Sequence, residues 1–177
     1  LTYARNSVWK DELTLWNDTV RKSPHKARPY NNRGLAYQNK GNFDQAFLDF
    51  NKAIENKPDD AEAYSNRGAA YVQKGNFDQA LLDYNKAVEI NPDFAEAYYN
   101  RGNFYQDKGN FEQAILDYNK AIEIKPNYSE AYNNRGNAYR NKGNFDQALS
   151  DYNKAVEIKS DFAEVYYIRA VIYFKKQ

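Results

Sequence analysis

The chain has 177 residues, with 25 basic and 24 acidic side chains, 17 tyrosines, and neither cysteine nor methionine. The net charge of +1 argues against a protein that binds nucleic acid by neutralising phosphates. The lack of cysteine excludes disulfides, thiolate metal sites and cysteine nucleophiles. No stretch is apolar for long enough to cross a bilayer, so we expect no direct membrane insertion. The tyrosines supply apolar mass for a folded core.

Residues 7–22 have the apolar spacing of one helix, with Trp9, Leu13, Trp16 and Val20 on a single stripe. They correspond to the second half of the repeat described below. We therefore expect residues 1–26 to be a partial repeat that caps the array. The start at Leu1 without methionine suggests a processed product or a fragment.

Glycine recurs with a step of 34 residues. The two series are Gly34, Gly68, Gly102 and Gly136, and Gly41, Gly75, Gly109 and Gly143. Pro58, Pro92 and Pro126 share this step. Such self-similarity predicts a tandem array. Full units are placed at 27–60, 61–94, 95–128 and 129–162, with a second partial unit, a C-terminal helix, at 163–177.

Each full unit predicts two short helices. In unit 61–94 they cover residues 61–74 and 77–90, each with apolar residues at helical spacing. Gly75 stands where the first helix must end in a left-handed residue. Asn76 and Gln79 have the spacing of a capping box for the second helix, and Asp93 and Glu96 repeat this spacing before the next unit.

These residues resemble the tetratricopeptide repeat. In unit 61–94 the matching positions are Tyr64, Gly68, Tyr71, Ala80, Tyr84, Ala87 and Pro92. The resemblance implies an all-α solenoid of helix-turn-helix units that forms part of a right-handed superhelix. It also implies that the first helices line the concave side and form a groove suited to an extended peptide.

The units depart from the family at one position, where arginine replaces the usual leucine: Arg33, Arg67, Arg101, Arg135 and Arg169. Aspartate recurs on the facing side of the second helix, as Asp49, Asp83, Asp117 and Asp151. We predict an ion pair within each unit. The alternative is that the arginines are exposed and contact a ligand.

An asparagine precedes each of the first four arginines: Asn32, Asn66, Asn100 and Asn134. Because an amide both donates and accepts hydrogen bonds, such a row could bind the backbone of an extended peptide. This row resembles the asparagine ladder in the groove of some family members. Neighbouring candidates for peptide binding are Tyr99, Asn103, Asn133, Asn137 and Tyr167. The structural alternative is that each asparagine caps or bridges to the adjacent unit.

Residues typical of catalysis are few. His25 is the single histidine and lies in an inter-repeat turn, without a cysteine or periodic carboxylate nearby. The periodic glutamates Glu62, Glu96, Glu130 and Glu164 follow Asp or Asn by three residues, which favours helix capping over acid-base chemistry. No phosphate-binding glycine motif is present. We predict that the chain is not an enzyme and needs no cofactor or metal.

The predicted function is a protein interaction module that binds a protein or peptide in its groove, the identity of the ligand being open. The alternative is structural, in which the array oligomerises through its ends or braces a larger membrane-bound enzyme such as a glycosyltransferase. The run from Arg5 to Pro24 favours this alternative, since it resembles the junction between membrane helices and repeat domains in some polytopic proteins.

Overall fold

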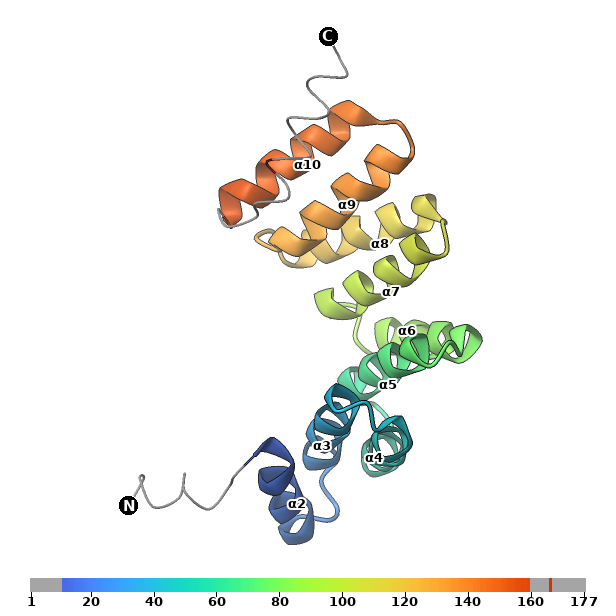
Figure 1. Cartoon of the computed structure of the whole chain (residues 1–177), viewed down its shortest axis with the longest axis vertical. Coiled ribbons are helices and arrows are strands. Elements are labelled where there is room, and N and C mark those ends of the chain that lie inside the picture. Colours follow the sequence, from blue (N-terminus) through green and yellow to red (C-terminus); the bar gives the residue numbers. More distant parts are fainter. Residues whose placement is uncertain (1–10, 160–165, 167–177) are drawn as a thin grey trace, which may run out of the picture. The chain divides into compact units, whose positions relative to one another are not determined.

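The computed structural model describes residues 11–159 and residue 166, and its secondary structure is entirely helical there. The helices are α2 (Glu12–Lys22), α3 (Ala27–Asn39), α4 (Phe43–Asn56), α5 (Ala61–Gln73), α6 (Phe77–Ile90), α7 (Ala95–Asp107), α8 (Phe111–Ile124), α9 (Ser129–Asn141) and α10 (Phe145–Ile158) (Figure 1). The chain forms two compact units that divide after Pro92. The N-terminal unit contains α2 to α6, and the C-terminal unit contains α7 to α10.

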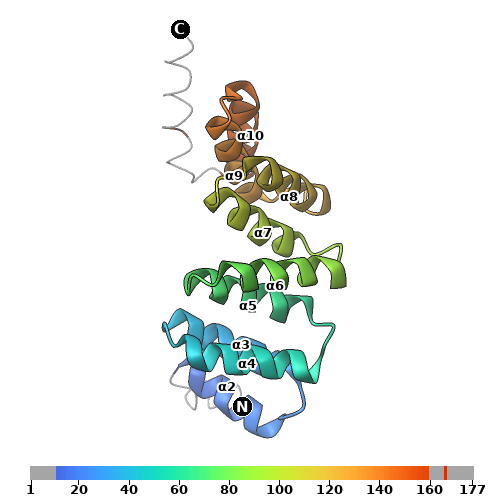
Figure 2. The same ribbon diagram turned by 90° about the vertical axis from the view of Figure 1, so that its right-hand side faces the viewer.

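Consecutive helices pair as hairpins within each unit. The pairs are α3 with α4 and α5 with α6 in the N-terminal unit, and α7 with α8 and α9 with α10 in the C-terminal unit (Figure 2). Neighbouring hairpins then stack, because α5 contacts both α3 and α4, and α9 contacts both α7 and α8. Tandem two-helix repeats, and with them the all-α fold, are therefore confirmed.

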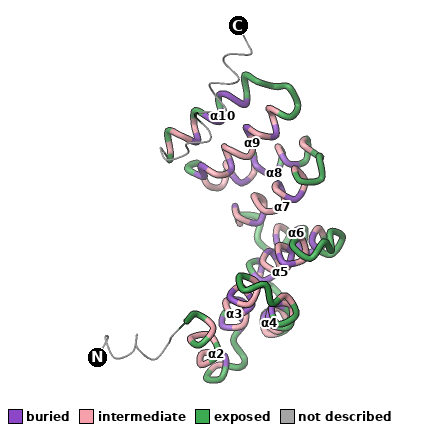
Figure 3. The backbone as a smooth tube through the Cα atoms, in the orientation of Figure 1, coloured by how far each residue is buried: buried purple, intermediate pink, exposed green. Residues whose placement is uncertain are grey.

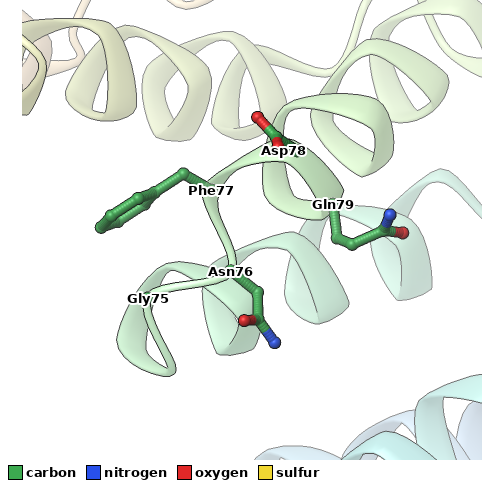
Figure 4. A pocket seen from close by; sticks show the side chains of 5 residues that line it. All are labelled: Gly75, Asn76, Phe77, Asp78 and Gln79. Atoms are coloured by element: carbon green, nitrogen blue, oxygen red, sulfur yellow. The ribbon is translucent and has the colours of Figure 1, made fainter.

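The turn inside each hairpin follows the sequence closely. Gly75 has φ +78°, and its counterparts in the other repeats have φ between +74° and +79°. The N–H of Asn76 donates to the carbonyl of Tyr71 over 2.9 Å, which closes the end of α5. Figure 4 shows this turn, whose five labelled residues line a cavity of about 330 Å³. The predicted left-handed glycine is confirmed.

The capping predictions are confirmed only in part. The Oδ1 atoms of Asn42 and Asn110 accept from the N–H groups of Gln45 and Gln113, over 3.3 and 3.2 Å. Asn76 begins α6 without such a bond from its side chain. The side-chain cap therefore recurs in some repeats and not in others.

The predicted caps of the first helices are wrong by one residue. The N-cap residues are Asp60, Phe94 and Tyr128 rather than Asp59, Asp93 and Asn127. The following glutamates therefore stand at the second helical position and cannot complete a capping box. They lie in the first turn, where the helix dipole favours a negative charge. Glu164 and its predicted cap lie outside the described residues.

Small residues bring the helices of each hairpin together around large rings. Ala80 and Ala87 are fully buried, as are Tyr118 and Tyr152. Figure 3 marks the buried positions along the paired helices in purple. A Cβ atom added to Gly102 would lie 2.7 Å from Cε1 of Tyr118, so this position admits no side chain without a shift of the ring. The predicted core of tyrosine, alanine and glycine is confirmed.

The ends match the sequence where they are described. Helix α2 packs on α3 and buries Val20, as expected for a capping helix. Trp9 lies outside the described residues, as does the predicted C-terminal helix apart from Tyr166.

Candidate interaction surface

Each repeat contains a forked ion pair between its two helices. Nε and Nη2 of Arg67 donate to Oδ2 and Oδ1 of Asp83 over 2.8 and 2.7 Å. The same pairing joins Arg33 to Asp49, Arg101 to Asp117 and Arg135 to Asp151. The hydrogen bonding of Arg33 to the carboxylate of Asp49 raises the pKa of Arg33. The predicted ion pairs are confirmed in four repeats, and Arg169 lies outside the described residues.

The guanidinium groups also reach the preceding repeat. Nη1 of Arg67 donates to Oδ1 of Asn51 over 2.6 Å, and Nη1 of Arg135 donates to Oδ1 of Asn119 over 2.6 Å. Nη1 of Arg33 bonds Asn17 on α2 in the same way, over 3.0 Å. These asparagines were not predicted from the sequence, although their step of 34 residues matches that of the arginines. Each of these three forks therefore joins three helices.

The amide row of the N-terminal unit bridges two first helices. Nδ2 of Asn66 on α5 donates to Oδ1 of Asn31 on α3 over 3.0 Å. Asn31 is 2% exposed, and its Nδ2 donates to Oε1 of Glu62 over 3.2 Å. Asn32 makes no hydrogen bond through its side chain within the described ranges. The bridging alternative thus describes Asn66.

A larger polar cluster joins α7 and α9 in the C-terminal unit. Nδ2 of Asn134 donates to Oδ1 of Asn103 over 2.8 Å and to the hydroxyl of Tyr99 over 3.1 Å. The hydroxyl of Tyr118 donates to the same Asn103 oxygen over 2.8 Å. Nδ2 of Asn133 donates to Oδ1 of Asn134 over 3.2 Å. Asn134 therefore also bridges consecutive repeats.

Burial affects the phenol groups of this cluster. It raises the pKa of Tyr99 and, more strongly, that of Tyr118. The ring of Tyr99 packs 4.9 Å from that of Tyr128 and 6.1 Å from that of Tyr118, measured between centroids. Asn137 accepts from the hydroxyl of Tyr152 over 2.8 Å. Tyr99, Asn103, Asn133 and Asn134 thus come together in one site.

The remaining candidates have other places in the chain. Asn32 and Asn66 belong to the N-terminal unit, Asn100 holds the equivalent position on α7, and Asn137 bonds Tyr152. Tyr167 lies outside the described residues. The sequence therefore placed four of its nine candidate residues in one contiguous cluster.

Three buried amide oxygens on the first helices have no hydrogen-bond partner within the described chain. They are Oε1 of Gln38 on α3, Oε1 of Gln106 on α7 and Oδ1 of Asn133 on α9. No other buried side-chain nitrogen or oxygen among residues 11–159 lacks a partner. Buried polar atoms are normally hydrogen-bonded, so these acceptors can receive bonds from a donor outside the chain.

The second helices expose a row of leucines. Leu48, Leu82 and Leu116 are 61%, 61% and 57% exposed, at one leucine per repeat. Ser150 holds the same position in the fourth repeat. Isolated exposed leucines are common on protein surfaces, so these residues alone do not indicate a binding site.

The described residues contain no cluster of acidic or histidine side chains suited to a metal ion. His25 is exposed in the turn before α3. Within the described part, no helix is both long and apolar enough to span a membrane.

Stacked two-helix repeats, each with two glycines and one forked ion pair, define a helical-repeat protein. The tetratricopeptide repeat model matches residues 27–60, 95–128 and 129–162, and related TPR repeat models match residues 68–109 and 50–81. The chain belongs to the tetratricopeptide repeat family. Members of this family generally serve as protein interaction scaffolds and are typically non-catalytic.

Several solved structures are similar to this chain. Crystalline MamA is 28% identical, with a TM-score of 0.71 over 86% of this chain and 89% of that chain. The pilF protein of Pseudomonas aeruginosa has a TM-score of 0.80 and is 23% identical, over 85% of this chain and 68% of that chain. A thermophilic TPR protein of Thermus thermophilus gives 0.77 at 21% identity, over 92% and 89%; the last two support the fold alone. A comparison with curated proteins found no match.

Proposed function

We propose that the chain is a non-catalytic protein interaction module that binds an extended peptide along its first helices. The peptide surface is α3 and α5 in the N-terminal unit and α7 and α9 in the C-terminal unit. Its proposed contact residues are Asn32, Asn66, Asn100, Asn134, Tyr99, Asn103, Asn133, Asn137 and Tyr167, to which we add Gln38 and Gln106. An extended peptide suits such a surface because its backbone presents regularly spaced donors and acceptors.

The three unpartnered amide oxygens carry this proposal. All three are acceptors, and all three lie on first helices, although the second helices supply about half of the structure. Peptide N–H groups are donors that approach from outside, and an amide side chain accepts them without selecting the side chains of the peptide.

The asparagines Asn66 and Asn134 have a second role in this proposal. Because Asn66 and Asn134 bond the preceding repeat, they hold neighbouring first helices at a fixed spacing. Oδ1 of Asn66 accepts no bond within the described chain and is free to accept one from a peptide. Asn134 contributes mainly by orienting Asn103 and Asn133, since both hydrogens of its Nδ2 are engaged.

Capture from a displayed library of unstructured peptides tests the proposal. Replacing Gln106→Met keeps the length of the side chain and removes the buried oxygen. The melting temperature is then expected to hold or rise, because an unsatisfied polar atom is lost. Peptide capture is expected to fall about fivefold, the effect of one hydrogen bond.

A matched control changes the opposite face. Leu116→Ser introduces the residue that the fourth repeat already carries at this position, and it should leave both melting and capture unchanged. Undiminished capture by the Gln106→Met variant, with peptides still selected by the native chain, would contradict the proposed surface.

A further inference from the structure

The first repeat differs from the third and fourth at one of two positions that lie 29 residues apart. In the C-terminal unit these positions hold ion pairs, Glu96 with Lys125 at 3.0 Å and Glu130 with Lys159 at 3.8 Å between Oε1 and Nζ. The first repeat has Arg28 and Lys57 at the same positions. Two cations therefore stand where the third and fourth repeats pair an acid with a base.

Both cations line one cavity of about 460 Å³. This cavity lies where α3 and α5 begin and α4 ends, and Lys26 adds a third cation to its lining. Arg28, Lys57 and Lys26 are exposed and have no acidic partner within the described part of the chain. The sequence departs from its own repeat pattern here, and such departures often mark function.

The remaining polar groups of the cavity are already bonded. Asn31 donates to Glu62 and accepts from Asn66. Nδ2 of Asn56 donates to the carbonyl of Pro24 over 3.2 Å, and Asp60 accepts from the N–H of Ala63. The three cations are therefore the groups left to bind a ligand.

We propose that this cavity binds an acidic side chain of a protein partner. The guanidinium of Arg28 can bond both oxygens of one carboxylate, while Lys26 and Lys57 add attraction. Three cations against Asp60 and Glu62 leave one net positive charge, which matches a single carboxylate. A phosphate group carries nearly two negative charges, so its binding would leave an excess of negative charge in this cavity, whereas a single carboxylate leaves it neutral. The site does not depend on the peptide surface proposed above.

Nuclear magnetic resonance of the whole chain at low ionic strength tests this site. The probe is a capped Gly-Ser-Glu-Glu-Ser-Gly peptide, and its matched control replaces both glutamates by glutamine. The acidic peptide is expected to shift the backbone amide resonances of residues 26–31 and 56–62. The glutamine peptide should leave these resonances in place, and added salt should weaken the response because exposed charges are screened.

Arg28→Glu restores the acid-base combination of the third and fourth repeats and therefore should not lower the melting temperature. It is expected to weaken binding of the acidic peptide about tenfold, since attraction becomes repulsion. Lys57→Gln, at the partner position, should weaken it about threefold. Glu96→Gln makes a control change at the equivalent site of another repeat and should leave binding unchanged.

Three results would overturn the proposal. The first is equal binding of the acidic and glutamine peptides, and the second is full binding by both the Arg28→Glu and Lys57→Gln variants. The third is a response to inorganic phosphate with none to the acidic peptide, which would make the cavity a site for a free anion.

Discussion

The guanidinium of Arg67 holds the carboxylate of Asp83 through two parallel hydrogen bonds of 2.8 and 2.7 Å. The two side chains are 19% and 7% exposed, so this pair is shielded from most of the solvent. The family usually has leucine at the position of Arg67. The chain thus keeps a charged link where its relatives use apolar packing.

Asp83→Asn should destabilise the chain by about 2 to 3 kcal/mol, because an amide oxygen cannot satisfy both N–H groups and the guanidinium loses its counter-charge. The free energy of unfolding in urea measures this loss. The double variant Arg67→Leu, Asp83→Leu should recover most of it, since apolar packing replaces the pair. A loss below about 0.5 kcal/mol would show that the pair behaves as an exposed one.

Two glycines of one repeat should respond differently to alanine. Gly102→Ala places a Cβ against the buried ring of Tyr118, whose hydroxyl is fixed by Asn103. Overpacking should cost about 2 kcal/mol, and the higher helix propensity of alanine offsets part of this. Gly109→Ala meets open space and is opposed only by its φ of +74°, at about 1 kcal/mol. Thermal melting of both variants checks the order, and a reversed order would contradict the packing described.

Asn134→Ala should lower stability by about 1 to 2 kcal/mol, because Asn103 and Tyr99 lose their common donor. Asn32→Ala, in the equivalent place of the first repeat, should change stability by less than about 0.5 kcal/mol. Circular dichroism melts compare the two. Equal losses would mean that the position acts through helix propensity rather than through the bridge.

Stability should fall at high pH because of Tyr118. Burial raises its pKa far above that of an ordinary tyrosine, so the phenol stays protonated in the folded chain while it ionises in the unfolded one. Above about pH 10 the unfolded state binds fewer protons, and the free energy of unfolding therefore decreases as the pH rises. In Tyr118→Phe this decrease should be shallower by roughly 1.4 kcal/mol per pH unit.

The phenylalanine variant also loses the bond to Asn103, at about 1 kcal/mol near neutral pH. Urea unfolding measured across the alkaline range separates this constant loss from the change in slope. An unchanged slope would show that Tyr118 ionises equally in both states.

The hairpins and their ion pairs could be predicted because they depend on contacts within one repeat. The glycine at position 75 is predicted from the left-handed backbone conformation of one turn. Arg67 and Asp83 lie 16 residues apart, and the turn between the two helices of one hairpin brings them together. Each of these signals also recurs in every repeat, so that chance matches are excluded.

Contacts between repeats were harder to predict. The bond from Asn66 to Asn31 depends on how two hairpins stack, and the sequence offered peptide binding and bridging as equal alternatives. The start of α5 was misplaced because Asp59 and Asp60 both suit an N-cap, and only Asp60 takes that place. The cavity with Arg28 and Lys57 was not predicted, because these residues stand out only when they are compared with the ion pairs at the equivalent positions of the third and fourth repeats.

The bond from a fork to an asparagine of the preceding helix, described for Arg33, Arg67 and Arg135, bears on how the number of repeats could increase. If the repeat after Asn51 came from a relative with leucine in place of Arg67, Asn51 would lose the guanidinium group that donates to its Oδ1 atom. Duplication of the chain's own 34-residue segment carries a matching arginine, aspartate and asparagine with every copy. Duplication of the chain's own repeat therefore preserves the hydrogen bonds between arginine and asparagine of consecutive repeats. Recombination with other repeat proteins would lose them at each boundary between repeats of different origin.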